Sequence, residues 1–128
     1  MAPVNATLEY TKNAVMTSSR AKLVVMMYEG AIRYVEQARF HLDRKSHAAC
    51  GTAISNAYNV ISELKVCLDY ESGGEIGRDI STNLERLYTF MLETLVTVNS
   101  SRDPENLDHV RELLGTLKSA WDEIVGQA

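Results

Sequence analysis

The sequence predicts an all-α fold, an antiparallel four-helix bundle, and three observations support that prediction. The chain has 128 residues, the size of one ordinary domain, and 45% of them are hydrophobic. Its two prolines are Pro3 and Pro104, so the long stretch between them lacks the residue that most reliably breaks a helix. Hydrophobic residues recur at intervals of three and four, which is the spacing of a helix that packs one face onto a core.

The first helix is expected to start near Ser19, a favourable N-cap residue, and to span about residues 20–43. One row of hydrophobic residues follows its length: Leu23, Met27, Ala31, Tyr34, Ala38 and Leu42. A second row beside it broadens the hydrophobic face: Val24, Tyr28, Ile32 and Val35. Residues 1–18 have no sustained period, so we expect them to form a mobile or short-helical arm ahead of a bundle spanning residues 19–126.

The second helix is expected over about residues 47–70 and the third over about residues 76–100. Gly73, Gly74 and Gly77 gather between them, where a chain that reverses direction needs positive φ. Asp103 followed by Pro104 has the form of an N-cap and a first helical proline, and it predicts a fourth helix over about residues 104–125. The three expected rows are Cys50, Ile54, Ala57, Ile61, Leu64 and Leu68; Ile80, Leu84, Leu87, Met91, Leu95 and Val98; and Leu107, Val110, Leu114, Leu117, Trp121 and Ile124. Four such helices joined by short turns bury their rows by packing as antiparallel neighbours.

Composition and motifs argue against several functional classes. The net charge of −4 disfavours a general nucleic-acid binder, and no hydrophobic run approaches the roughly 20 residues that span a bilayer. Cys50 and Cys67 form neither a CxxC pair nor a disulfide framework, which favours a reducing compartment. The sequence contains no ExxH, GxxxxGK[ST] or GxGxxG pattern, so we expect no metal, no cofactor and no enzymatic activity.

One short motif offers an alternative function. The segment from His47 to Gly51 resembles the HxxKG motif of histidine phosphotransfer domains, which are also four-helix bundles, but Cys50 replaces the lysine. In that family the histidine lies in mid-helix, whereas His47 is expected beside the start of a helix. A solvated residue of the first turn is therefore the plainer interpretation, and phosphotransfer through His47 is the second hypothesis.

The distribution of charge points to a binding surface. Residues 46–62 contain no Lys, Arg, Asp or Glu, and Glu93 is the single charged residue in residues 87–101. If the second and third helices are antiparallel neighbours, these two stretches coincide in space and form one uncharged patch, as at the centre of an interface. A tightly packed bundle or a dimer face is the alternative. The candidate client-binding residues are Tyr10, Met26, Ile54, Ser55, Tyr58, Ile61, Leu87, Phe90, Met91 and Thr94.

Several short segments, taken in their order along the chain, match the pattern of a known family. They are Tyr10-x-x-Asn13-x-Val15-x-Thr17, Met26-Met27-Tyr28-Glu29-Gly30-Ala31, Leu68-Asp69-Tyr70, Gly73-Gly74-Glu75-Ile76, Asn83-Leu84, Leu87-Tyr88 with Met91, Asn99, Leu113-Leu114, and Ala120-Trp121 with Ile124. Together they resemble the FliS-type flagellin export chaperones along nearly the whole chain. Arg20 departs from the pattern, since the family commonly has proline there.

The resemblance implies a non-enzymatic cytoplasmic chaperone. It would bind the disordered C-terminal segment of flagellin, prevent premature polymerisation and assist delivery to the export gate of the flagellar type III apparatus. By the same resemblance, the N-terminal arm with Leu8, Tyr10 and Val15 would act as a lid over a hydrophobic groove until a client displaces it. A co-chaperone or an anti-sigma factor is a further candidate partner, and the chain is expected to be a monomer or a homodimer.

Overall fold

The chain folds into four helices with no strand among its described residues. The computed structural model describes the backbone of residues 2–71 and 73–127, and the side chains of residues 20–71 and 73–126. Helix α1 spans Ala2–Asp43, α2 spans His47–Val66, α3 spans Gly74–Ser101 and α4 spans Pro104–Gln127. The predicted all-α class is confirmed.

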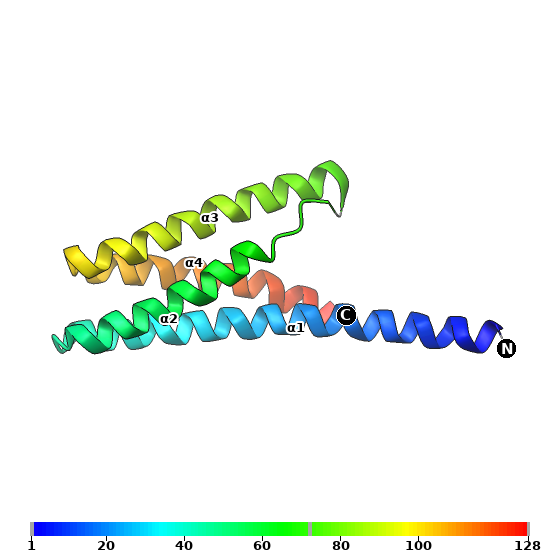
Figure 1. The fold of residues 1–128 in the computed structure, drawn as a ribbon, viewed down its shortest axis with the longest axis horizontal. Helices are drawn as coiled ribbons and strands as arrows, with labels where there is room; N and C mark the ends of the chain where they lie inside the picture. The colour runs from blue at the N-terminus through cyan, green and yellow to red at the C-terminus, as the bar shows by residue number, and fades with distance from the viewer. Residues whose placement is uncertain (1, 72, 128) are drawn as a thin grey trace.

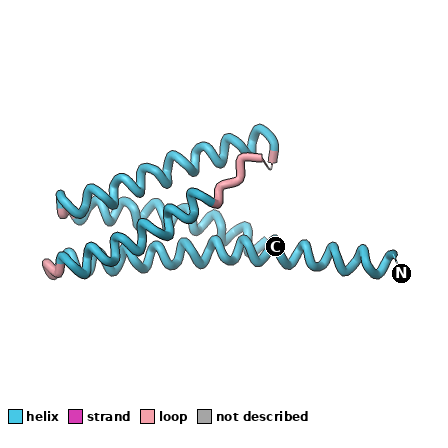
Figure 2. The backbone as a smooth tube through the Cα atoms, in the orientation of Figure 1, coloured by secondary structure: helices cyan, strands magenta, loops and turns pink. Residues whose placement is uncertain are grey.

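The helices form an antiparallel bundle, as Figures 1 and 2 show. Helix α1 packs against α2 and α4, and α3 packs against the same two helices, so α1 and α3 lie diagonally across the bundle. The N-terminal part of α1 continues straight past the other three helices (Figure 1). The predicted four-helix arrangement is therefore confirmed, and each neighbouring pair runs antiparallel.

The helix boundaries differ from the sequence-based ones by more than two residues in two places. Helix α1 begins at Ala2, so the expected start near residue 20 is not a boundary, and residues 2–19 continue the same helix. Pro3 lies in the first turn, where its missing N–H costs no helical hydrogen bond, and no later residue of this segment is a strong helix breaker. Helix α2 ends at Val66 rather than near residue 70, and the Ser81 hydroxyl donates to the Asp69 carbonyl in the connection that follows, at 2.5 Å.

The three turns depend on residues with left-handed backbone conformation. Gly73 has a φ of 83°, and a Cβ built there would lie 3.2 Å from the Cα of Gly77. Lys45, two residues after the end of α1, and Arg102, directly after α3, take the same region with φ of 59° and 54°. The predicted cap of α4 is present, because the Asp103 carboxylate accepts the backbone N–H of Glu105 at 3.0 Å.

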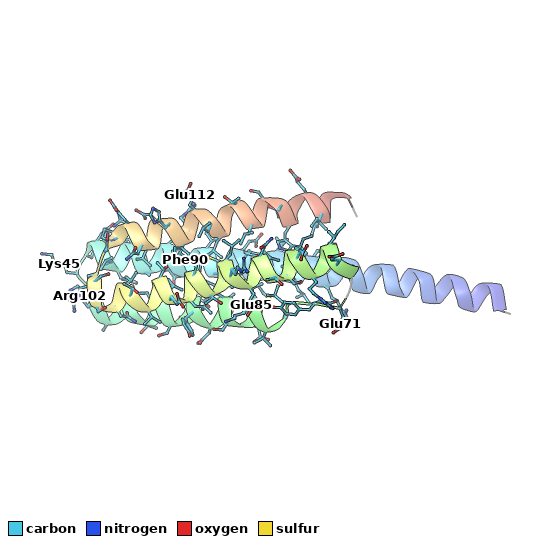
Figure 3. All side chains as sticks on the ribbon, turned by 90° about the horizontal axis from the view of Figure 1, so that it is seen from above. Lys45, Glu71, Glu85, Phe90, Arg102 and Glu112 are labelled. Carbon is cyan, nitrogen blue, oxygen red and sulfur yellow. The ribbon has the colours of Figure 1, made fainter. Side chains whose placement is uncertain are left out.

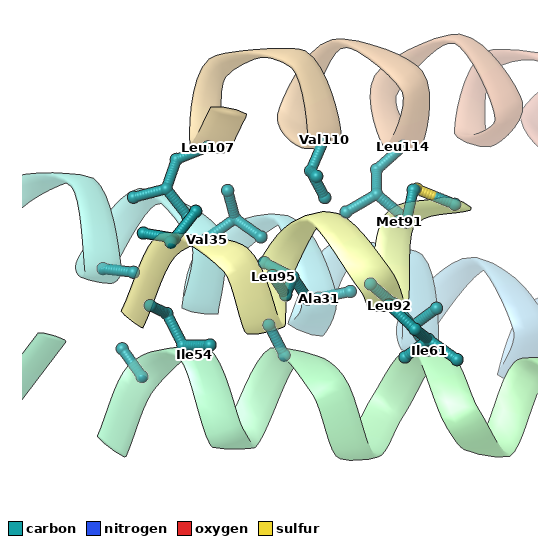
Figure 4. Packing of buried hydrophobic residues seen from close by; sticks show 14 of the residues in the cluster. Ala31, Val35, Ile54, Ile61, Met91, Leu92, Leu95, Leu107, Val110 and Leu114 are labelled. Carbon is teal, nitrogen blue, oxygen red and sulfur yellow. The ribbon is translucent and has the colours of Figure 1, made fainter. Parts of the chain in front are cut away.

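The hydrophobic core lies along the half of the bundle that contains the α1–α2 and α3–α4 turns. Its largest completely buried side chains are Tyr28, Val35, Ile61, Tyr88, Met91, Leu95, Val98, Leu107, Val110 and Leu114. Figure 4 shows side chains from all four helices meeting in this cluster. Tyr28 on α1 and Tyr88 on α3 hydrogen-bond through their hydroxyl groups, which joins the two diagonal helices across the core.

Ion pairs occupy one seam of the surface, between α1 and α4. Arg39 pairs with Asp108 at 3.0 Å, Arg111 pairs with Glu36 at 2.9 Å, and the Lys118 ammonium lies 3.9 Å from Glu29. Exposed pairs of this kind contribute little stability individually. They place charged side chains along the α1–α4 seam from residue 29 to residue 39 of α1.

Candidate functional site

A surface groove between α2 and α3 is the best candidate for a binding site. One half of it is lined by Ile54, Ser55, Tyr58, Asn59, Val96 and Asn99. It continues past Tyr58 along Lys65, Thr89, Leu92, Glu93 and Val96, and then reaches Ser62, Val66, Tyr70 and Glu85. We call this surface the α2–α3 groove.

Hydrophobic side chains are exposed along the groove. Tyr58 is 36% exposed and Val96 is 58% exposed, while Ile54 is buried and forms part of the floor. From Ile54 to Val66 the groove follows α2 for about 18 Å, at the rise of 1.5 Å per residue. That length corresponds to three to four turns of a partner helix.

The half of the groove around Ser55 carries no ionised group. Its polar residues are Ser55, Asn59 and Asn99. The charged residues Lys65, Glu85 and Glu93 lie in the other half, toward the C-terminal end of α2. The two charge-poor stretches of the sequence do lie side by side, because α2 and α3 pack together and run antiparallel (Figure 1).

A hydrogen bond fixes the far end of the groove. The Tyr70 hydroxyl donates to the Glu85 carboxylate at 2.5 Å. This bond, with burial and the charge of Glu85 as smaller causes, raises the pKa of Tyr70 above its ordinary value. Tyr70 is therefore neutral at physiological pH and holds the connection after α2 against α3.

The structure separates the candidate client-binding residues into several groups. Ile54, Ser55 and Tyr58 line the α2–α3 groove. Ile61 and Met91 are completely buried. The prediction that they lie on an open binding surface is therefore wrong, and both belong to the core. The remaining candidates lie elsewhere, on α1 or on the opposite flank of α3.

Phe90 is exposed, but it lies on the α4 side of α3, where it meets His109, Glu112, Leu113 and Thr116. Thr94 is half-buried one helical turn after Phe90, and its hydroxyl donates to the Phe90 carbonyl at 2.7 Å. Leu87 is also half-buried and lies one turn before Phe90 on the same face. The expected single patch is thus divided by α3 into two surfaces.

Met26 is exposed on α1, outside both surfaces. The side chains of Tyr10, Leu8 and Val15 lie outside the described residues. Residues 23–26 of α1, residues 76–80 of α3 and the C-terminal part of α4 are close to the end of the bundle past which α1 extends (Figure 1). Several exposed hydrophobic side chains belong to these segments: Leu23, Met26, Ile76, Ile80 and Ile124.

Sequence reasoning missed Val96 and Val66, two of the most exposed hydrophobic residues of the groove. Val96 follows Leu92 by four residues in a charge-poor stretch, outside the expected core row. The sequence did contain a signal for Val96: it is a hydrophobic residue outside the core row, in a part of the helix that has almost no charged residues.

The described residues offer little support for catalysis or metal binding. They contain no group of three or more His, Cys, Asp and Glu side chains that could hold a metal ion. His47 is the exposed first residue of α2, and its Nε2 lies 3.3 Å from a guanidinium nitrogen of Arg102, so it is not the mid-helix histidine of a phosphotransfer domain. Among the same residues, no helix is long and hydrophobic enough to cross a membrane.

Known proteins with a similar sequence are flagellar chaperones. A family described as flagellar protein FliS matches residues 3–128. The flagellar secretion chaperone FliS of Salmonella typhimurium is 36% identical over 118 residues, which cover 91% of this chain and 84% of the relative. FliS of Vibrio cholerae is 36% identical over 84% of this chain and 76% of the relative. FliSB of Pseudomonas aeruginosa is 37% identical over 80% of this chain and 79% of the relative.

A solved structure has the same fold. A crystal structure of a flagellar chaperone from bacteria superposes with a TM-score of 0.79 at 20% sequence identity, and the match covers 98% of both chains. At that level of identity the likeness concerns the fold alone.

Proposed function

The chain belongs to the FliS family of flagellar chaperones, and from that premise we propose that it binds the disordered C-terminal segment of flagellin in the cytoplasm. Bound in this way, the client cannot polymerise early, and the complex assists its delivery to the flagellar type III export gate. The family is one of secretion chaperones, which is a non-enzymatic role. Phosphotransfer through His47 is not proposed.

The observation that carries the proposal is the open α2–α3 groove. Tyr58 and Val96 remain exposed beside an uncharged half lined by Ser55, Asn59 and Asn99. A flagellin terminus that becomes helical in the filament is amphipathic, and its hydrophobic face can cover these side chains. Unpaired charges at the groove centre would have to be desolvated first, so their absence favours such binding.

The expected affinity is moderate. A disordered segment must order its backbone as it binds, and that entropy offsets part of the gain from burying hydrophobic surface. This balance suits a chaperone, because the client has to be released for export.

We extend the proposal to the N-terminal arm. In the present structure residues 2–19 continue α1 beyond the bundle and lead away from the α2–α3 groove (Figure 1). We propose that a second conformation folds the arm, with Leu8, Tyr10 and Val15, over exposed hydrophobic surface when no client is present. Client binding would then displace it.

The test is to place a charge in the groove. Ser55 is an exposed groove residue, so Ser55→Lys puts an ammonium group where the client would have to desolvate it. We expect calorimetric titration with the flagellin C-terminal segment to show affinity at least about tenfold weaker, with an unchanged melting temperature. Thr94→Lys is the matched control, because it adds the same group to the other flank of α3.

A Ser55→Lys protein that binds flagellin as tightly as the unmodified chain would exclude the α2–α3 groove as the client site. Equal losses in both lysine variants would indicate a general effect of charge and would also count against the groove.

A further inference from the structure

Phe90 is a large aromatic side chain on the outer surface of the bundle, 50% exposed. On one side it adjoins α4 through His109, Glu112, Leu113 and Thr116. On the other it borders a shallow hollow along α3 formed with Thr82, Glu85, Arg86, Thr89 and Glu93. We call this surface the Phe90 surface; Figure 3 labels Phe90 on α3 and Glu112 on the neighbouring α4.

The charges around Phe90 are predominantly negative. Glu85, Glu93 and Glu112 contribute three carboxylates, Arg86 contributes one cation, and His109 is the remaining titratable group. Glu85 already accepts the hydroxyl of Tyr70. Among the described residues, Glu93 and Glu112 form no ion pair, in contrast to Glu29, Glu36 and Asp108 on the α1–α4 seam, which all face a cation.

A second exposed phenylalanine in the same chain shows what is missing at Phe90. Phe40 is also 50% exposed, and the guanidinium carbon of Arg44, four residues later, lies 3.7 Å from the centre of its ring. Phe90 has Arg86 four residues earlier, but within the described part of the chain no cation lies over its ring. An exposed ring beside unpaired carboxylates fits a cation on an aliphatic stem.

From this complementarity we infer that the Phe90 surface docks a cationic amphipathic helix of a protein partner other than the client. An Arg or Lys of that helix would lay its methylene groups on the Phe90 ring and direct its charge to Glu112 or Glu93. A neighbouring aliphatic residue would pack on Leu113. Glu85, Thr89 and Glu93 line both the α2–α3 groove and the hollow beside Phe90, but Phe90, Leu113 and Glu112 lie on the α4 flank, outside the groove.

The probe is a synthetic helical peptide of about four turns, with Leu and Arg on one face and Ala and Gln elsewhere, labelled for fluorescence anisotropy. The full chain should bind it saturably. Phe90→Ser should weaken binding about tenfold or more, and Glu112→Lys should weaken it by a similar factor and reduce its dependence on salt. Glu123→Lys is the matched control: it makes the same change on exposed α4 surface outside the site, and it should have a small effect.

Two further controls keep the inference falsifiable. Glu112 is exposed, so its variants should fold even if Phe90→Ser lowers the melting temperature. Ser55→Lys should leave peptide binding unchanged, and Phe90→Ser should leave flagellin binding unchanged, which separates this inference from the proposed function. Absence of peptide binding, equal binding by Phe90→Ser and Glu112→Lys, or self-association of the chain through Phe90 would overturn it.

Discussion

Two buried tyrosines are the main polar feature of the core. Tyr28 and Tyr88 are almost completely excluded from solvent, and their hydroxyl groups bond to each other between α1 and α3. Burial is the largest cause that raises the pKa of both phenols, and Tyr28 also interacts with Trp121, which lowers its pKa in part. Both rings are therefore neutral in the folded protein, and each polar group has a partner.

This pair predicts a loss of stability at alkaline pH. The folded-state pKa of each tyrosine lies above its ordinary value of 10.0, so the folded protein holds these protons more tightly than the unfolded chain. Their contribution is fully present below about pH 10 and decreases as the pH rises toward the folded-state pKa. Urea unfolding at increasing pH should show the free energy of unfolding falling above about pH 10.

The double variant Tyr28→Phe/Tyr88→Phe is the control for this prediction. It removes both titrating groups together, so neither is left as an unpaired hydroxyl, and the alkaline decrease should become smaller. Tyr70 and Lys118 also have raised pKa values and will retain part of it. An identical decrease in the double variant would contradict the assignment to this pair.

Individual glycines have opposite roles in the helices and turns. Gly73 has a left-handed backbone conformation, and an added Cβ would make a tight contact with Gly77, whereas Gly115 lies within α4 with open space where a Cβ would be. Gly73→Ala should lower the free energy of unfolding by about 1–2 kcal/mol. Gly115→Ala should raise it by about 0.5–1 kcal/mol, because alanine has the higher helix propensity.

Chemical denaturation of the two variants checks this prediction. A Gly73→Ala protein as stable as the unmodified chain would show that the turn after α2 can relax. Destabilisation by Gly115→Ala would show that the α4 surface near residue 115 has less space than the structure indicates.

The extension of α1 is separable from the bundle. Among the described side chains of α1, residues 20–43, the first buried one is Tyr28. Deleting residues 1–15 should therefore leave a cooperative thermal transition close to that of the full chain. If the arm acts as a lid, the deletion should alter binding of the flagellin segment or of the export gate. A truncated protein that behaves identically in both binding assays would refute a role for the arm.

The positions of the helices in the sequence were largely predictable. The rotation of each helix about its own axis, which decides which side chains face the core, was not. Asp103, Pro104 and Gly73 mark boundaries through local chemistry, and three-and-four spacing identified the hydrophobic rows. Ser19 misled because serine is tolerated within a helix as well as at its start. Spacing defines a face, but only packing decides where that face points. Met91 and Phe90 are adjacent in sequence, yet one lies in the core and the other on the α4 flank.

Across the whole bundle, the seams between neighbouring helices differ in the side chains that they expose. The α1–α4 seam carries ion pairs, whereas the α2–α3 groove leaves Tyr58 and Val96 exposed beside uncharged polar groups. The charge-poor stretches predicted this asymmetry because antiparallel packing brings them together. The sequence could not show that α3 divides the expected patch, since that depends on how both neighbouring helices pack against it.

Site-specific photo-crosslinking to the flagellin C-terminal segment shows directly whether the client occupies the α2–α3 groove. A photoreactive phenylalanine analogue would replace Tyr58 in the α2–α3 groove or, as the control, Phe40 on α1, since both are exposed aromatic residues. We expect a crosslink from position 58 that unlabelled flagellin segment competes away, and little product from position 40. Crosslinking at position 40 with none at position 58 would contradict it.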